Sequence, residues 1–305
     1  MHFTGVRKNS ERGRAKKEKK NQVIMENTAD LLVQAAWSGS DRVLTQLLAR
    51  VGADADAVGE VDGARGTPLL AASFRGQVRC VQALLAARAQ IDLPGRGGQW
   101  DTALYNASMA GHAACVQTLL DGGASLQPDS VFPPLYVAAN HGQPECVRLL
   151  LRANASIDVE HEGLTPLCSS AQLGYAACVQ ALIDAGADVN SGSHGTPLWL
   201  ASQGVCNLDH DNRDVTEECG AEAYEECVRL LLAANASVDA ALHEDSSTPM
   251  HVAAQNGNAP IVQLLLQAGA DTTLCRSDGE TPLDAAHRNG HSECVELLTS
   301  RRRWS

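Results

Sequence analysis

Aromatic residues are scarce in this chain of 305 residues, which contains only eleven Phe, Trp and Tyr. Hydrophobic residues nevertheless make up 44% of the chain, mostly as Ala, Leu and Val. This composition favours short helices that pack closely on one another over a core of large aromatic side chains.

Long apolar runs are also absent. No stretch approaches the roughly 20 apolar residues that a membrane-spanning helix requires. The basic N-terminus is not followed by the short apolar segment of a secretory signal. We therefore predict an intracellular protein without membrane association, in the cytoplasm or alternatively the nucleus.

Lysine is missing from residues 21–305, because all five lysines lie among the first 20 residues. That segment has a net charge of +6, which leaves −18 for the rest of a chain whose total is −12. An acidic body disfavours binding of nucleic acid and favours a protein partner. The missing lysines have two explanations: a biased genome, or a body kept free of ubiquitin acceptors.

The basic segment is predicted to form a disordered tail over residues 1–26, and residues 301–305 form a short C-terminal tail. Three interpretations of the basic tail remain open. It is a nuclear-localisation or anionic-surface segment, a solvating end, or a stretch upstream of a true start at Met25.

A short motif, Thr-Pro-Leu or a close variant, recurs at steps of 35, 31, 32, 31, 52 and 33 residues. A threonine at such a position caps a helix, and proline fits the first helical position. Small residues and, in six of the seven cases, a glycine nine residues after the start complete a short helix. A second apolar helix follows. The motifs start at Thr67, Thr102, Pro133, Thr165, Thr196, Thr248 and Thr281.

This pattern resembles the ankyrin repeat. Residues 31–39 and 43–48 follow the same order without the Thr-Pro start, which gives about eight repeats over residues 27–300. The resemblance implies an all-α ankyrin-repeat solenoid of helix-turn-helix repeats with hairpin fingers. It also implies an adaptor or scaffold that binds a protein partner across a concave surface made of the fingers and first helices.

The second helices are similar to those of ankyrin proteins with a suppressor-of-cytokine-signalling box, as in Gly111-His112 followed by Cys115-Val116. That resemblance implies an alternative function as the substrate-receptor subunit of a ubiquitin ligase. The family's box should follow the last repeat, where only residues 301–305 stand.

Six cysteines occupy the same position, each directly before a valine in a second helix. A metal or redox array would need these thiols to converge, whereas successive repeats hold them about 10 Å apart. We predict buried free thiols and no metal site. The six are Cys80, Cys115, Cys146, Cys178, Cys227 and Cys294.

The step of 52 residues places an acidic insertion at about residues 205–224 of the sixth repeat. Cys206, His210 and Cys219 carry zinc-ligand side chains, and Asp209, Asp211 and Asp214 carry calcium-ligand side chains, but neither set has the standard motif spacing. We predict instead that Thr216 caps an extended second helix and that the preceding loop adds a charged contact.

Aromatic residues that stand on fingers or first helices are candidate partner-binding residues, because aromatics dominate binding hot spots. Tyr105, Tyr136 and Trp199 replace the usual His after Thr-Pro-Leu, which only His251 keeps; the alternative is that they fill gaps between repeats. The predicted partner-binding residues are Trp37, Phe74, Arg75, Trp100, Tyr105, Met109, Phe132, Tyr136, His141, Leu173 and Trp199.

Asn190 ends a segment that is similar to ankyrin sites modified by an asparaginyl hydroxylase; alternatively it is the ordinary hairpin residue of the repeat. The chain has no phosphate loop, nucleophile elbow or His-Glu-x-x-His helix. We therefore predict a non-enzymatic, monomeric protein that uses no cofactor.

Overall fold

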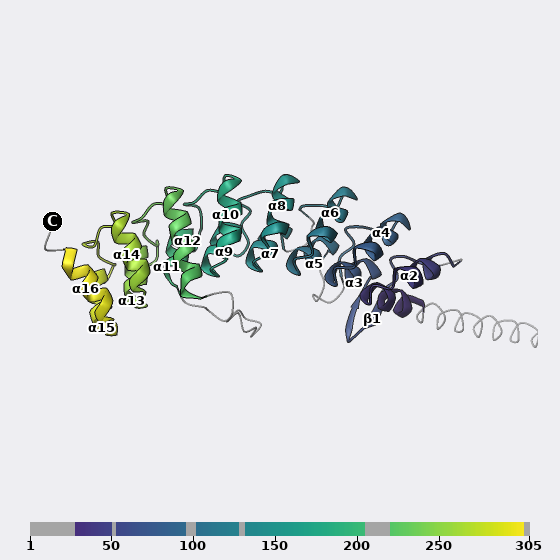
Figure 1. Ribbon diagram of the computed structural model, residues 1–305, viewed down its shortest axis with the longest axis horizontal. Helices are drawn as coiled ribbons and strands as arrows, with labels where there is room; N and C mark the ends of the chain where they lie inside the picture. The colour runs from purple at the N-terminus through teal and green to yellow at the C-terminus, as the bar shows by residue number, and fades with distance from the viewer. Residues whose placement is uncertain (1–27, 51–52, 96–101, 128–131, 205–219, 302–305) are drawn as a thin grey trace, which may run out of the picture. The chain divides into compact units, whose positions relative to one another are not determined.

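The computed structural model describes residues 28–50, 53–95, 102–127, 132–204 and 220–301 (Figure 1). The basic tail, Trp100 and the candidate zinc and calcium ligands of the insertion lie outside these residues. The chain divides into two compact units between Val131 and Phe132, and each is described by itself.

The first unit contains three helix pairs and a two-stranded hairpin. Its opening helix covers residues 28–37. The other elements are α2 (Asp41–Leu48), β1 (Gly59–Val61), β2 (Ala64–Gly66), α3 (Pro68–Phe74), α4 (Val78–Ala86), α5 (Ala103–Met109) and α6 (Ala113–Asp121).

The second unit contains five helix pairs, so the described residues form the eight pairs that the sequence predicts. Its helices are α7 (Pro134–Asn140), α8 (Pro144–Arg152), α9 (Pro166–Gln172), α10 (Ala176–Asp184), α11 (Pro197–Ser202), α12 (Ala221–Ala233), α13 (Pro249–Gln255), α14 (Ala259–Gln267), α15 (Pro282–Asn289) and α16 (Ser292–Arg301).

The recurring motif starts the first helix of each pair after the opening one, as expected. The hydroxyl of Thr67 accepts a hydrogen bond from the Leu70 amide at 3.3 Å, and that of Thr165 accepts one from the Cys168 amide at 3.1 Å. Each bond satisfies an amide that the helix itself leaves unpaired. Pro133 has no side chain that can do this, so α7 begins without a side-chain cap.

The glycine after the first helix adopts a left-handed conformation. At Gly76, φ is +69°, and a Cβ there would lie 2.6 Å from Nδ1 of His112. That imidazole reaches back to the first helix of the preceding repeat, where its Nε2 lies 3.0 Å from the carbonyl oxygen of Phe74. Glycine is therefore required both by the backbone and by the close approach of the next repeat.

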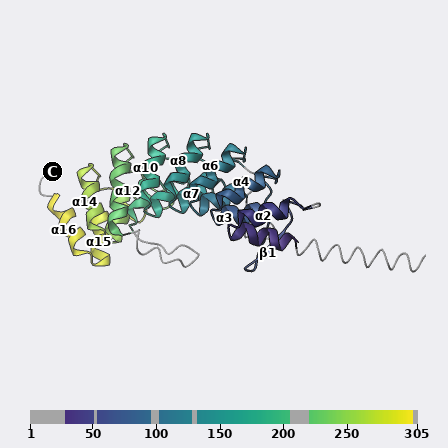
Figure 2. The ribbon, with the colours of Figure 1, turned by 45° about the vertical axis from the view of Figure 1, so that its right-hand side comes forward.

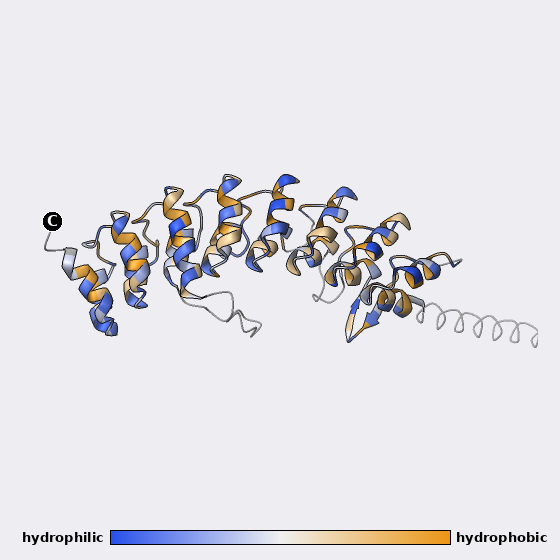
Figure 3. Cartoon of the chain, in the orientation of Figure 1, coloured by the Kyte–Doolittle hydropathy of each residue, from blue (hydrophilic) through white to orange (hydrophobic). Residues whose placement is uncertain are grey.

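Within each unit the odd-numbered helices form one layer and the even-numbered helices the other (Figures 1 and 2). We call these the inner and outer helices. Small inner residues such as Ala71 and Ala72 are fully buried and let adjacent helices approach closely. Apolar and polar residues alternate along the outer helices, as on α12 and α14 (Figure 3), so one side packs on the core.

The fingers that connect successive repeats are tied by a series of side-chain bonds, which we call the finger ladder. In each step a carboxylate or amide oxygen of one repeat accepts a hydrogen bond from a backbone amide of the next; the acceptor lies on a finger except for Asp30, which lies in the opening helix. The bonds are Asp30 to Glu60, Asp56 to Gln90 and Asp92 to Ser125 in the first unit, and Asp158 to Asp188, Asn190 to Ser237 and Asp239 to Asp271 in the second, at 2.8–3.2 Å.

All six cysteines at the shared position are free and buried, as predicted. Burial raises the pKa of Cys80 and Cys115 to about 11 and that of Cys178 to about 12. These thiols therefore remain protonated at neutral pH and behave as small apolar side chains.

The second helix of the sixth repeat is extended, as expected, but its predicted cap is wrong. Helix α12 has 13 residues instead of the nine of α10, and it begins at Ala221 with Gly220 at the N-cap. The N-cap residue Gly220 has an extended backbone, with φ −65° and ψ 162°, and Thr216 lies outside the described residues.

Candidate protein-binding surface

One side-chain position recurs on every inner helix, seven residues after its N-cap, and we call it the inner row. Trp37 joins it, because it precedes Gly39 by two residues just as Phe74 precedes Gly76. In the first unit all members are apolar, and in the second unit all are polar. The members are Trp37, Phe74 and Met109, then Asn140, Gln172, Gln203, Gln255 and Arg288.

The row is partly accessible because it lies at the end of each inner helix, beyond the small residues that pack between repeats. Phe74, Met109 and Gln172 are half-buried, whereas Arg288 is exposed. These side chains are supported by the core and still present atoms to solvent. Such a surface suits recognition, since little side-chain entropy is lost on binding.

Three predicted binding residues meet in the first unit. The rings of Trp37 and Phe74 are stacked, with centroids 5.7 Å apart and planes inclined by 15°. The guanidinium carbon of Arg75 lies 4.9 Å from the centroid of the Trp37 ring. Arg75 itself is exposed, so this cluster offers a cation and apolar ring surface at one place.

Tyr105 and Met109 lie on the next inner helix, α5, and both are half-buried. Tyr105 is at the third helical position, where its backbone amide donates to Thr102 Oγ1 at 3.2 Å. Met109 is at the end of the helix and continues the apolar part of the inner row.

Phe132 and Tyr136 lie close to His161 of the following finger in the second unit. The His161 ring centroid is 4.5 Å from that of Phe132 and 5.0 Å from that of Tyr136. Phe132 is 37% exposed, whereas Tyr136 is only 8% exposed. Phe132 is therefore the member that presents ring surface to solvent, and Tyr136 mainly fills space between repeats.

The remaining predicted residues are less accessible. Trp199 is half-buried, and its indole Nε1 donates to Ser247 Oγ at 3.2 Å, which ties the sixth repeat to the next finger. His141 and Leu173 are half-buried, and Nδ1 of His141 lies 3.0 Å from the Val137 carbonyl oxygen. These positions support the inner surface as well as forming part of it.

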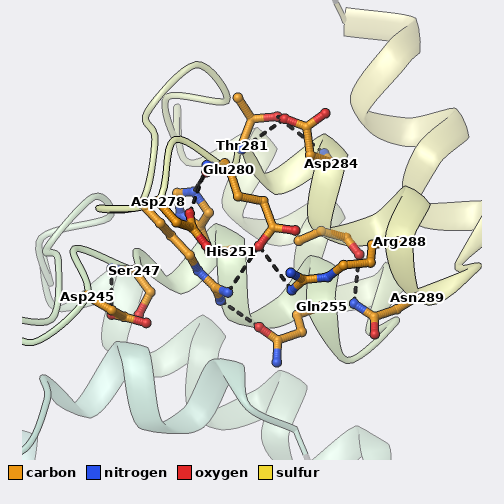
Figure 4. Close-up of polar contacts among 12 residues, drawn as sticks. Asp245, Ser247, His251, Gln255, Asp278, Glu280, Thr281, Asp284, Arg288 and Asn289 are labelled. Atoms are coloured by element: carbon orange, nitrogen blue, oxygen red, sulfur yellow. Dashed lines mark hydrogen bonds and ion pairs between the residues drawn. The ribbon is translucent and has the colours of Figure 1, made fainter.

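A charged cluster that the sequence analysis missed lies at the end of the inner row (Figure 4). The carboxylate of Glu280 lies 3.4 Å from Arg276 and 3.0 Å from Arg288. The Arg276 guanidinium also donates to Gln255 Oε1 at 2.7 Å. The side chains of Arg276 and Glu280 are only 11% and 10% exposed, whereas Arg288 is 58% exposed.

Two cations share the Glu280 carboxylate in this cluster, and Arg276 also interacts electrostatically with Asp245, so Arg288 is the cation that remains exposed. The signal available in the sequence was the pair of opposite charges on either side of the turn at Gly279, where φ is +85°. That turn brings Arg276 and Glu280 together, because the Arg276 amide donates to the Glu280 carbonyl at 2.9 Å.

His251 keeps the structural role expected of the repeat histidine. Its Nδ1 accepts from the Thr248 amide at 3.2 Å and lies 2.8 Å from the Thr248 hydroxyl. Its Nε2 lies 3.1 Å from the Glu280 carbonyl oxygen, so the neutral ring with a proton on Nε2 satisfies both sides. Burial is the main cause that lowers the pKa of His251.

Asn190 is a member of the finger ladder. Its side-chain oxygen accepts from the Ser237 amide at 2.8 Å, and its own amide donates to Asp188 Oδ1 at 2.9 Å. The residue is exposed. Hydroxylation of Asn190 stays a prediction, which mass spectrometry of the peptide that contains it would test.

Among the described residues no group of three or more His, Cys, Asp or Glu is arranged to hold a metal ion. In the same part of the chain, every helix is too short or too polar to cross a bilayer.

Paired short helices that stack in two layers define a helical-repeat protein. The family model described as ankyrin repeats (3 copies) matches residues 32–130, 127–193 and 218–303. The chain therefore belongs to the ankyrin-repeat family, whose repeats are non-catalytic modules for protein–protein interaction.

Curated relatives share these repeats. The chain is 31% identical over 80% of its length to the ankyrin repeat and KH domain-containing protein mask-1 of Caenorhabditis elegans, of which it covers 8%. It is 38% identical over 65% of its length to mouse ankyrin repeat and SOCS box protein 10, of which it covers 42%. The chain thus spans less than half the length of either relative.

A solved structure is similar over most of its length. The ankyrin repeat domain of human ASB11 aligns with a TM-score of 0.54 and 27% identity, covering 88% of this chain and 96% of that one.

Proposed function

We propose that this protein is an adaptor or scaffold that binds a partner protein across the inner row and the adjacent fingers. The observation that carries this proposal is the stacked Trp37 and Phe74 with Arg75 above the indole. Aromatic and arginine side chains that are held in place by packing are typical of binding hot spots.

The mechanism is preorganisation. Apart from α7, the inner helices from α3 to α15 begin at a threonine, and a left-handed glycine follows each of them, so the row is held in place before the partner arrives. Binding then costs little ordering of the receptor. A partner footprint of about 1,600 Å² in total would be ordinary for such a complex.

The test compares two variants of the full chain in quantitative affinity capture. The inner variant carries Arg75→Ala and Phe132→Ala. The outer variant carries Val43→Ala and Arg79→Ala, which also removes one exposed apolar side chain and one exposed arginine, since Val43 is 50% exposed and the Arg79 side chain 85%. Circular dichroism and thermal unfolding establish that both variants fold.

We expect a set of partners to fall at least tenfold with the inner variant and to persist with the outer one. Identical partner sets for both variants and the parent chain would contradict the proposal. Light scattering of the parent chain should give the monomer mass of 32.2 kDa.

A second function is favoured by a specific similarity. Relatives named ankyrin repeat and SOCS box proteins and the ASB11 repeat domain match this chain, and residues 21–305 contain no lysine. A substrate receptor of a ubiquitin ligase would benefit from a body without ubiquitin acceptors. Ubiquitin-ligase subunits captured equally by both variants would support this function, and their absence would speak against it.

For the cellular location we propose the cytoplasm, with the nucleus as the alternative. A fluorescent fusion that is cytoplasmic with residues 1–24 present would support the first. Nuclear signal that disappears when those residues are deleted would support the second.

A further inference from the structure

We infer that the inner row of the second unit binds an extended segment of a partner protein in polyproline II conformation, through side-chain amides that bond its main chain. This inference rests on the proposed function and adds the class of partner. It starts from four amides at the same distance from the N-cap of four successive inner helices: Asn140, Gln172 and Gln255 end α7, α9 and α13, and Gln203 is the C-cap of α11.

The two outer members of this amide series are held by their neighbours. Asn140 Nδ2 donates to Ser169 Oγ at 2.8 Å, which leaves its carbonyl oxygen directed by that bond. Gln255 Oε1 accepts from Arg276 at 2.7 Å, which leaves its NH₂ group as a donor. The series therefore begins with an oriented acceptor and ends with an oriented donor.

The two central members are half-buried and available. The side-chain amides of Gln172 and Gln203 make no hydrogen bond to another described residue. An amide offers both donors and acceptors without charge, which is the set of groups that a polypeptide main chain requires. In the first unit the same positions carry Trp37, Phe74 and Met109, so this chemistry is confined to the second unit.

The spacing of the amides selects the conformation of the partner. Adjacent packed helices are about 8–10 Å apart. A polyproline II helix rises about 3.1 Å per residue with three residues per turn, which is about 9.3 Å per turn. Every third residue of such a segment would meet the next amide with the same face. A β-strand has the right rise but a period of two, so every third residue alternates between faces.

The chemistry of the amides favours an extended partner segment over a helical one. An α-helix could place every seventh residue against successive repeats, but its main-chain groups are already bonded internally. A polyproline II segment has no internal hydrogen bonds, so its amides and carbonyls are free to pair with glutamine side chains.

The charge of Arg288, at the C-terminal end of the inner row, predicts the charge of the partner residue that binds there. Arg288 is the next member of the inner row after Gln255, and it is 58% exposed while it shares the Glu280 carboxylate with Arg276. Arg276 also interacts electrostatically with Asp245, so Arg288 is the cation of this cluster that faces solvent and can pair with an acidic side chain of the partner. The partner segment should therefore place an acidic residue about three positions beyond the one that meets Gln255.

The test uses a displayed library of random 16-residue peptides, selected on the immobilised full chain. We expect enriched peptides to show side-chain preferences with a period of three, proline between them and an acidic residue at one end. The affinity of a selected synthetic peptide should fall about tenfold with Gln172→Ala and Gln203→Ala together, since two hydrogen bonds are lost. The peptide should also bind more weakly to Arg288→Ala.

The matched control carries Gln180→Ala and Gln263→Ala, which removes two glutamines from the outer helices α10 and α14 and should leave peptide affinity unchanged. A second inner variant, Gln172→Met and Gln203→Met, keeps side-chain volume if the alanine variant fails to fold.

No enrichment, a period of seven, or equal affinity for the inner and control variants would overturn the inference. The proposed function is judged separately, because loss of captured partners with Arg75→Ala and Phe132→Ala would still support it in any of those cases.

Discussion

Phe74 lies stacked on Trp37, one repeat away, with ring centroids 5.7 Å apart. Aromatic pairs of this kind contribute about 0.5–1.5 kcal/mol beyond the area that they bury. A double-mutant cycle with Trp37→Ala, Phe74→Ala and both should therefore give a coupling free energy of about 1 kcal/mol in urea unfolding. Additive effects of the two substitutions would show that the stack does not form in solution.

Thr165 should contribute to stability through its cap of α9. Its hydroxyl is buried and accepts from the Cys168 amide at 3.1 Å. Thr165→Ala should lower the free energy of unfolding by about 1 kcal/mol, because that amide then lacks a partner. Thr165→Ser keeps the hydroxyl and should cost clearly less in the same denaturant titration; equal losses would mean that the methyl group is what matters.

Two glycines with similar backbone angles should differ in their tolerance of a side chain. Gly63 has φ +79° and open space around it, whereas Gly76 has φ +69° and faces the His112 ring. Gly63→Ala should cost about 1–2 kcal/mol from the left-handed backbone alone. Gly76→Ala should cost more, because the next repeat must move. Thermal unfolding of the two variants measures the difference, and a larger loss for Gly63→Ala would contradict this packing.

His251 should make stability depend on pH. Its folded-state pKa is lowered, mainly by burial, from the ordinary value of 6.5, so the unfolded chain binds the proton more readily. Its contribution is therefore fully present above about pH 6.5 and is lost as the pH falls below that value. Comparison of unfolding free energies with those of His251→Gln over pH 5–8 isolates this histidine from the others. Parallel curves would contradict the assignment.

The cysteines should separate into two classes by reactivity. Cys275 is exposed, whereas Cys80, Cys115 and Cys178 are buried with raised pKa values. Iodoacetamide should therefore alkylate Cys275 in the native protein and the other three only after unfolding. Peptide mass spectrometry of native and guanidinium-treated samples checks this. Labelling of Cys115 at the native rate of Cys275 would show that the helix pairs open readily.

The repeat could be predicted from the sequence because its signals are local. Thr67 and Thr165 cap their helices, and Gly76 takes the left-handed conformation expected of it. The position of Cys115 before a valine also predicted its burial, since helical periodicity determines which face of the helix packs on the core.

Contacts between fingers could not be predicted in this way. The Glu280 carboxylate reaches both Arg276 and Arg288 only after the turn at Gly279 and helix α15 have formed. Tyr136 was a binding candidate by residue type, yet the following finger covers most of its ring. The predicted cap at Thr216 was wrong, because the N-cap of α12 is Gly220, four residues later in the chain.

The finger ladder has a direction. Within each unit the acceptor side chain, such as Asp56 or Asp158, belongs to the earlier repeat, and the backbone amide that it satisfies belongs to the later one. During synthesis, the backbone amide of each new repeat can therefore bond to an acceptor side chain of the repeat already made. Its own acceptor side chain stays hydrated until the next repeat follows. Removing repeats from the C-terminal side would therefore release side-chain acceptors to water, whereas removing them from the N-terminal side would release backbone amides. The two ends of the array thus differ in which hydrogen-bonding groups they offer to a neighbouring repeat.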